Sequence, residues 1–111
     1  MAAGQEAYQK KSRMRVEILN TAENDLEEGF RFYEAQSVGL GAYFLDSLFS
    51  DIDSLAFFAG IHQKHSGYYR LLAKKFPFAV YYTVKENVVL VYAVLDCRRK
   101  PCWIHNKLMK S

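Results

Sequence analysis

A run of basic residues follows the most strand-like segment of the chain. Arg98, Arg99 and Lys100 are separated by two residues from an apolar stretch, Val88–Leu95, and are followed by Trp103. Neighbouring cations beside an aromatic ring can bind phosphate groups or an acidic protein surface, by ion pairing and by stacking. Because adjacent side chains on a strand point to opposite faces, at most two of the three cations share a face. The alternative is that they only protect a sheet edge from aggregation.

Further cations and a set of tyrosines precede this run. Arg70 lies within a predicted strand, and Lys74 and Lys75 lie near its end. They could bind phosphate or an acidic partner; an ion pair of Arg70 within the chain and simple solvation of the lysines are the alternatives. Tyr81 belongs to the tyrosines that could stack on nucleotides or line a groove for a partner segment. We predict a partner-binding surface made of Arg70, Lys74, Lys75, Tyr81, Arg98, Arg99, Lys100 and Trp103.

Histidines and cysteines are the other residues that could perform chemistry. The possible zinc ligands are His62, His65, His105, Cys97 and Cys102. Their spacing matches no standard zinc site, so we predict neither a metal site nor a cofactor. His62 or His105 could act as a general base, because imidazole titrates near neutral pH. The sequence places no serine or cysteine beside them, which leaves a solvated histidine as the alternative.

The composition predicts one domain with a divided charge. Half of the 111 residues are apolar, enough for one modest core. Residues 14–61 carry two basic and nine acidic side chains, whereas residues 62–111 carry ten basic and two acidic ones. No apolar run approaches the roughly 20 residues of a membrane span, and the N-terminus has no apolar signal segment. We therefore predict a cytoplasmic protein with reduced cysteines and no membrane partner.

The N-terminal half predicts a strand followed by two helices. Residues 1–13 are expected to be a flexible tail, with a single domain over residues 14–111. Met14–Leu19 alternates polar and apolar residues, as a half-buried strand does. Apolar residues then recur at helical spacing from Ala22 to Tyr33, over about four turns, and again from Leu40 to Leu55. The short link between them predicts an antiparallel helical hairpin.

The C-terminal half predicts strands. After a loop at 61–67, Tyr69–Val84 reads as two strands joined by a turn at Pro77, and Glu86-Asn87 turns the chain into the last strand, Val88–Leu95. The order is strand, helix, helix, strand, strand, strand. The expected fold is therefore α+β, with the helical hairpin packed on one face of a small antiparallel sheet.

Several short motifs follow one another along the chain in a recognisable order. They are Gly39-Leu40-Gly41 between the helices, Arg70-Leu71-Leu72, Phe76-Pro77-Phe78, Tyr81-Tyr82-Thr83-Val84 and Arg98-Arg99-Lys100-Pro101. In this order the chain resembles the RelE/ParE superfamily of bacterial toxins, over roughly Met14 to Trp103. The resemblance implies a RelE/ParE-like fold and the toxin of a type II toxin–antitoxin pair, with a cognate antitoxin whose extended or helical segment wraps the toxin.

The superfamily has two branches with different activities. RelE-like members cut messenger RNA in the ribosome, whereas ParE-like members poison DNA gyrase and have no known bond-breaking activity of their own. RNA cleavage needs a group that takes the proton of the 2′-hydroxyl, cations for the developing charge and an acid for the leaving oxygen. In the nuclease branch, the resemblance implies lysines on the first hairpin strand, an arginine after the aromatic of the second, and a C-terminal arginine and tyrosine.

This chain departs from the nuclease pattern at three places. Ala79 follows Phe78 where an arginine is expected, and the first hairpin strand carries a single cation, Arg70. Either Cys97 or Arg98 takes the position of the C-terminal arginine, and Trp103, which has no phenol, takes that of the tyrosine. The sequence therefore favours a ParE-like gyrase inhibitor without catalytic residues. The alternatives are an endoribonuclease that meets ribosome and mRNA, or an inactive relative; a nuclease would use Arg70, Arg98, Arg99 and His105.

Overall fold

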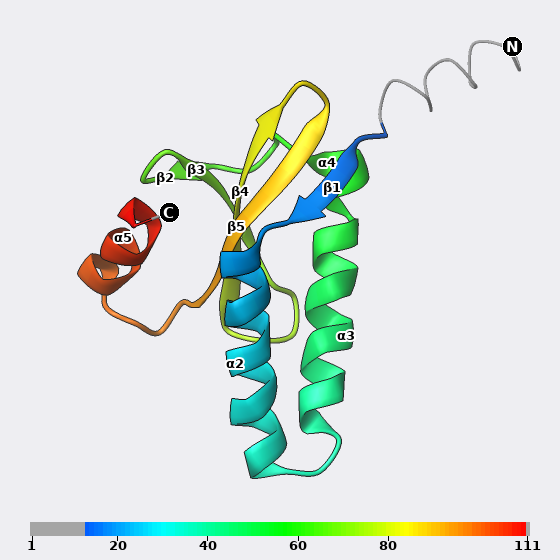
Figure 1. Ribbon diagram of the computed structural model, residues 1–111, viewed down its shortest axis with the longest axis vertical. Coiled ribbons are helices and arrows are strands. Elements are labelled where there is room, and N and C mark those ends of the chain that lie inside the picture. Colours follow the sequence, from blue (N-terminus) through cyan, green and yellow to red (C-terminus); the bar gives the residue numbers. More distant parts are fainter. Residues whose placement is uncertain (1–12, 111) are drawn as a thin grey trace, which may run out of the picture.

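Residues 13–110 are described by the computed structural model of the chain (Figure 1). Apart from Arg13, the predicted tail of residues 1–13 lies outside this range. The elements in chain order are β1 (Arg15–Ile18), α2 (Asn20–Gln36), α3 (Leu40–Asp53), the single turn α4 (Leu55–Phe58), β2 (Lys64–His65), β3 (Tyr68–Leu72), β4 (Phe78–Lys85), β5 (Val88–Asp96) and α5 (Pro101–Met109).

The five strands form one sheet in the order β1-β5-β4-β3-β2. The neighbours among β2, β3, β4 and β5 are antiparallel, as predicted. β1 pairs with β5 in parallel, from Arg15 opposite Val88 to Ile18 opposite Val91, so the sheet is mixed and not purely antiparallel. A parallel pair needs a long crossover, and the helical hairpin together with the other strands supplies it. The α+β class and the RelE/ParE-like arrangement are confirmed.

The helical hairpin covers one face of the sheet, with α2 and α3 side by side (Figure 1). Its apolar stripes are buried against the sheet, as their spacing predicted. Gly29 on α2 permits this approach, because a Cβ there would lie 2.5 Å from the ring of Phe44 on α3. The Glu34 carboxylate accepts the backbone N–H groups of Gly39 and Gly41, which fixes the link between the helices. The core residues from both layers include Ala22, Leu26, Tyr33, Phe44, Leu48, Ile52, Val80, Tyr82, Val89 and Val91.

The opposite face of the sheet is covered by α5, a helix that was not among the elements predicted from the sequence (Figure 1). Leu108 is buried there, with Trp103 and Ile104 partly buried beside it. Small side chains on the strands, Ala79 and Ala93, let this short helix lie close to the sheet. Pro101 at the first helical turn was the available signal, because proline is favoured at that position.

Candidate functional site

Two loops meet at one end of the sheet. The β3–β4 loop, residues 73–77, and the β5–α5 loop, residues 97–100, are joined by the backbone N–H of Cys97, which donates to the carbonyl oxygen of Pro77 at 2.8 Å. Each loop carries exposed cations. The structure thus brings together five of the predicted binding residues at what we call the basic end: Lys74, Lys75, Arg98, Arg99 and Lys100.

The β3–β4 loop is held in place from α3. Asp51 is buried, with 5% of its surface exposed, and its carboxylate accepts the backbone N–H of Lys74 at 3.1 Å. The ammonium of Lys75 lies 5.3 Å from the ring centroid of Tyr43. The loop that presents these two lysines is therefore anchored to the helical hairpin.

Arg98 is oriented by the carboxylate of Asp96, the last residue of β5. Its Nε lies 2.9 Å from Oδ1 of Asp96 and its Nη2 lies 2.7 Å from Oδ2, and its backbone N–H also donates to Oδ1. The guanidinium hydrogen bond holds the pKa of Asp96 below its usual range. Because Asp96 neutralises part of its charge, Arg98 is a pre-oriented hydrogen-bond donor more than a free cation.

Arg99 stacks on the only tryptophan of the chain. The guanidinium carbon of Arg99 lies 4.3 Å from the ring centroid of Trp103, and the ammonium of Lys107 lies 5.6 Å from it. A cavity of about 210 Å³ opens next to this pair, with Phe32 from α2 in its wall. Phe32 was missed in the sequence because it lies off the apolar stripe of α2, where an exposed aromatic gives no periodic signal.

Arg70 and Tyr81 lie between the sheet and α5, not at the surface of the basic end. Arg70 is partly buried, with its Nη2 3.8 Å from Sγ of Cys97. Tyr81 is opposite Arg70 on the neighbouring strand, and only 2% of its surface is exposed. Burial raises the pKa of the Tyr81 hydroxyl, against the opposing effect of the Arg70 guanidinium. In this structure the ring of Tyr81 packs in the cluster under α5, so a partner cannot contact it while α5 is in place.

The side chains of the alternative nuclease set have separate surroundings. Arg98 bonds Asp96 and Arg99 stacks on Trp103, whereas Arg70 faces Cys97. His105 has a partner that the sequence could not place: its Nδ1 lies 2.9 Å from Oγ of Ser66, in the turn between β2 and β3. No hydrogen bond, ion pair or ring contact links any two of these four side chains, although a nuclease needs them around one phosphate.

The position of the missing arginine is part of the interior. Ala79 has none of its surface exposed and packs in the cluster that contains Leu108 of α5. A long cation at this position would point into the contact between the sheet and the helix. The geometry therefore agrees with the sequence, in which this position carries a small apolar residue.

Among residues 13–110, no group of three or more His, Cys, Asp or Glu side chains could hold a metal ion. Cys97 and Cys102 are free thiols. None of the helices in the described part of the chain is long and apolar enough to cross a bilayer.

The chain matches a protein-family model and is similar in fold to a solved structure. A family model described as the ParE toxin of the type II toxin–antitoxin system, parDE, matches residues 16–101. A solved structure, the chromosomal ParDE toxin–antitoxin system from P. aeruginosa, is similar in fold with a TM-score of 0.62 and 17% sequence identity. The similarity covers 75% of this chain and 95% of that one. A search of curated proteins found no match.

Proposed function

Because the chain belongs to the ParE toxin family of type II toxin–antitoxin systems, we propose that it arrests growth by binding a protein target through its basic end. The proposed target is DNA gyrase, which the resemblance implies for this branch, and the proposed location is the cytoplasm. The antitoxin is the partner that membership of the family implies. No covalent bond is broken in this proposal.

The observation that carries the proposal is the grouping of cations from two loops. Lys74 and Lys75 of one loop and Arg98, Arg99 and Lys100 of the other are all exposed. Both loops are anchored, one by Asp51 and the other by the Asp96–Arg98 pair. A positively charged surface on fixed loops accelerates association with an acidic protein surface and selects against basic ones.

Two features support binding over RNA cleavage. Ala79, where the nuclease branch carries an arginine, is buried against α5. The remaining candidate cations and His105 each make a hydrogen bond or ring contact with a different side chain, and none of them contacts another of the set. Trp103 can stack on a partner group but has no phenolic proton to donate.

Pulse labelling after induced expression tests this function. The full chain is expressed in a bacterium without the antitoxin, and the incorporation of labelled thymidine and labelled amino acids is followed separately. We expect DNA synthesis to stop first. An early stop of protein synthesis would instead favour the endoribonuclease, and continued growth with normal labelling would identify an inactive relative.

A double substitution tests the assignment of the basic end. Arg98→Ala with Arg99→Ala is expected to abolish growth arrest, because it removes both guanidinium groups of the β5–α5 loop, while the domain stays folded. The matched control is Arg15→Ala with Lys85→Ala, which removes two exposed cations near the β4–β5 turn. Retained toxicity in a folded double variant, or equal loss in the control, would show that this surface does not carry the function.

A further inference from the structure

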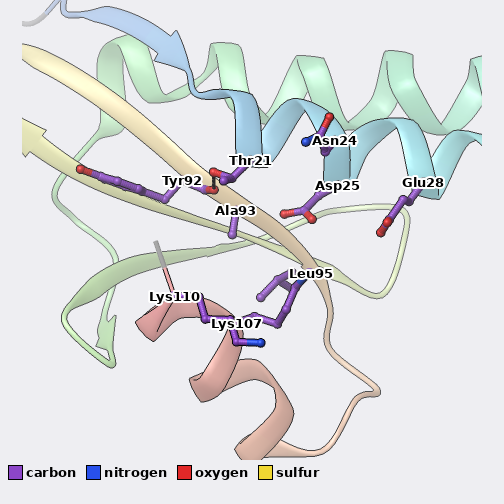
Figure 2. Close-up of a pocket in the computed structure, with 9 residues that line it drawn as sticks. All are labelled: Thr21, Asn24, Asp25, Glu28, Tyr92, Ala93, Leu95, Lys107 and Lys110. Atoms are coloured by element: carbon purple, nitrogen blue, oxygen red, sulfur yellow. Dashed lines mark hydrogen bonds between the residues drawn. The ribbon is translucent and has the colours of Figure 1, made fainter.

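A groove borders the basic end along the outer edge of β5, between α2 and α5. β1 pairs with β5 only as far as Val91, and α2 begins just beyond that point. Two cavities, of about 250 and 210 Å³, lie along this edge and share Asp25, Glu28 and Leu95 in their walls. Figure 2 shows the first of them, with α2 on one side and the lysines of α5 on the other. We call the two cavities together the α2–α5 groove.

Side chains of α2 already occupy the hydrogen-bonding edge of β5. The hydroxyl of Thr21 donates to the carbonyl oxygen of Tyr92 at 2.6 Å. One helical turn later, the carboxylate of Asp25 accepts the backbone N–H of Val94 at 3.0 Å. These bonds take the place of a further strand, so an occupant of the groove has to bind through its side chains and not by extending the sheet.

The cations that line the groove, Lys107, Lys110 and Arg99, compensate its carboxylates only in part. Burial raises the pKa of Asp25 to about 6, even though the N–H of Val94 and the charge of Lys107 act in the opposite direction. Glu28 lines both cavities and makes no hydrogen bond or ion pair with another residue of the described range. A cation placed between these two side chains would therefore be stabilised by both.

Aromatic rings make the second cavity suited to a flat cation. Phe32 is 53% exposed, and its ring contact within the chain is an edge contact with Tyr33. Trp103, in the same wall, already stacks with the guanidinium of Arg99. A ring face next to carboxylates is the environment in which arginine binds well, since its guanidinium stacks with one side and donates hydrogen bonds from its edge.

We propose that the α2–α5 groove receives an arginine side chain of the antitoxin, with its guanidinium against Phe32 and near Asp25 and Glu28. The inference rests on the proposed function, from which it takes the two partners. The basic end selects an acidic surface on the target, whereas the groove selects a cation. We therefore assign the groove to the antitoxin and not to the target. An antitoxin bound there would cover Arg99 and Trp103, which line the same cavity, and would thereby block the basic end.

Fluorescence of Trp103 provides a direct test, because it is the only tryptophan. The purified full chain is titrated with N-acetyl-arginine amide at pH 7.5 and, separately, with N-acetyl-citrulline amide, which has nearly the same shape without the charge. We expect a saturable change with the arginine probe and binding about tenfold weaker or more with citrulline, since charged hydrogen bonds are lost. An equal response to both probes, or no saturable response to the arginine probe, would overturn the proposal that the groove binds an arginine side chain.

Substitutions locate the binding. Asp25→Asn with Glu28→Gln is expected to weaken arginine binding about tenfold or more, because both carboxylates are lost. Glu28→Gln alone changes an exposed side chain, so it gives a readout that does not depend on the fold around Asp25. The matched control, Glu23→Gln with Glu27→Gln, removes two carboxylates from the same helix that do not line the groove. Equal weakening in the control would contradict the site.

The antitoxin itself tests the assignment of the occupant. Affinity for the antitoxin encoded with this toxin is measured for the groove variant and for the control. We expect about tenfold weaker binding for the groove variant only. Unchanged affinity would overturn the antitoxin as occupant even if the arginine probe binds. Growth arrest and DNA labelling with the wild-type chain test the proposed function separately, so the two failures are distinguishable.

Discussion

Replacing Asp25 by asparagine is expected to stabilise the fold at neutral pH. The side chain is enclosed between α2, β5 and α5, where desolvation raises its pKa from 3.8 to about 6. A difference of about two pKa units corresponds to roughly 3 kcal/mol between the two protonation states. Because the carboxylate is partly exposed, solvent screening reduces the expected gain to about 1–2 kcal/mol. Asparagine keeps a carbonyl oxygen that can accept the N–H of Val94.

The gain should depend on pH with a defined sign. Below pH 3.8 the carboxyl is protonated in both the folded and the unfolded chain, and its contribution to stability is fully present. Between pH 3.8 and about 6 the unfolded chain ionises first, so that contribution is lost as the pH rises. The advantage of the asparagine variant should therefore be small at pH 4 and reach its full size above pH 6.

Urea denaturation at a series of pH values measures this directly. The free energy of unfolding is determined for the wild type and for Asp25→Asn between pH 4 and pH 8, with Glu23→Gln as the control for an exposed carboxylate on the same helix. The expected result is a difference that grows with pH in the first variant and stays flat in the control. A destabilised Asp25→Asn protein at pH 7, or an advantage independent of pH, would refute the reasoning.

Three further substitutions test the packing around the site. Gly29→Ala places a Cβ 2.5 Å from the ring of Phe44 and should lower the free energy of unfolding by about 1–3 kcal/mol in urea denaturation; an unchanged value would mean that the ring can move. Asp51→Ala removes the acceptor of the Lys74 N–H and should cost about 1–3 kcal/mol in the same assay. Ala79→Arg buries a charge under α5 and should shift Trp103 fluorescence to the red; an unshifted spectrum would show that α5 tolerates it.

The sequence predicted the elements whose apolar pattern is regular. The stripe from Ala22 to Tyr33 gave α2, and the run Val88–Leu95 gave β5, because burial on one face or in a sheet imposes a period on the residues. The second predicted helix divides at Ser54 into α3 and α4, and the predicted loop at 61–67 contains the two-residue strand β2. Such short interruptions leave no periodic signal.

Pairings between distant segments could not be predicted from local pattern. The residues Arg15–Ile18 do not indicate that their neighbouring strand is β5 or that the pair is parallel. Strand pairing depends on which later segment of the chain comes to lie beside β1. In the middle and last turns of α5, only Ile104 and Leu108 are apolar residues that pack against the sheet. Two such residues are too few to give a helical period, so this helix was missed. The cations of the basic end were all named from sequence, but the anchors Asp51 and Asp96 were not, since a carboxylate that accepts a backbone N–H looks like any surface acid.

The parallel pairing of β1 with β5 has a consequence for the order of events during synthesis. Arg15 pairs with Val88, 73 residues later, so the first strand has no neighbour until nearly the whole chain has been made. At 5–20 residues per second, this delay lasts roughly 4–15 s. The cations of the β5–α5 loop follow the closing strand, so they are translated after every other part of the sheet. A chain interrupted before Asp96 lacks both the completed sheet and Arg98 to Lys100, and truncated products are therefore expected to be harmless to the cell that makes them.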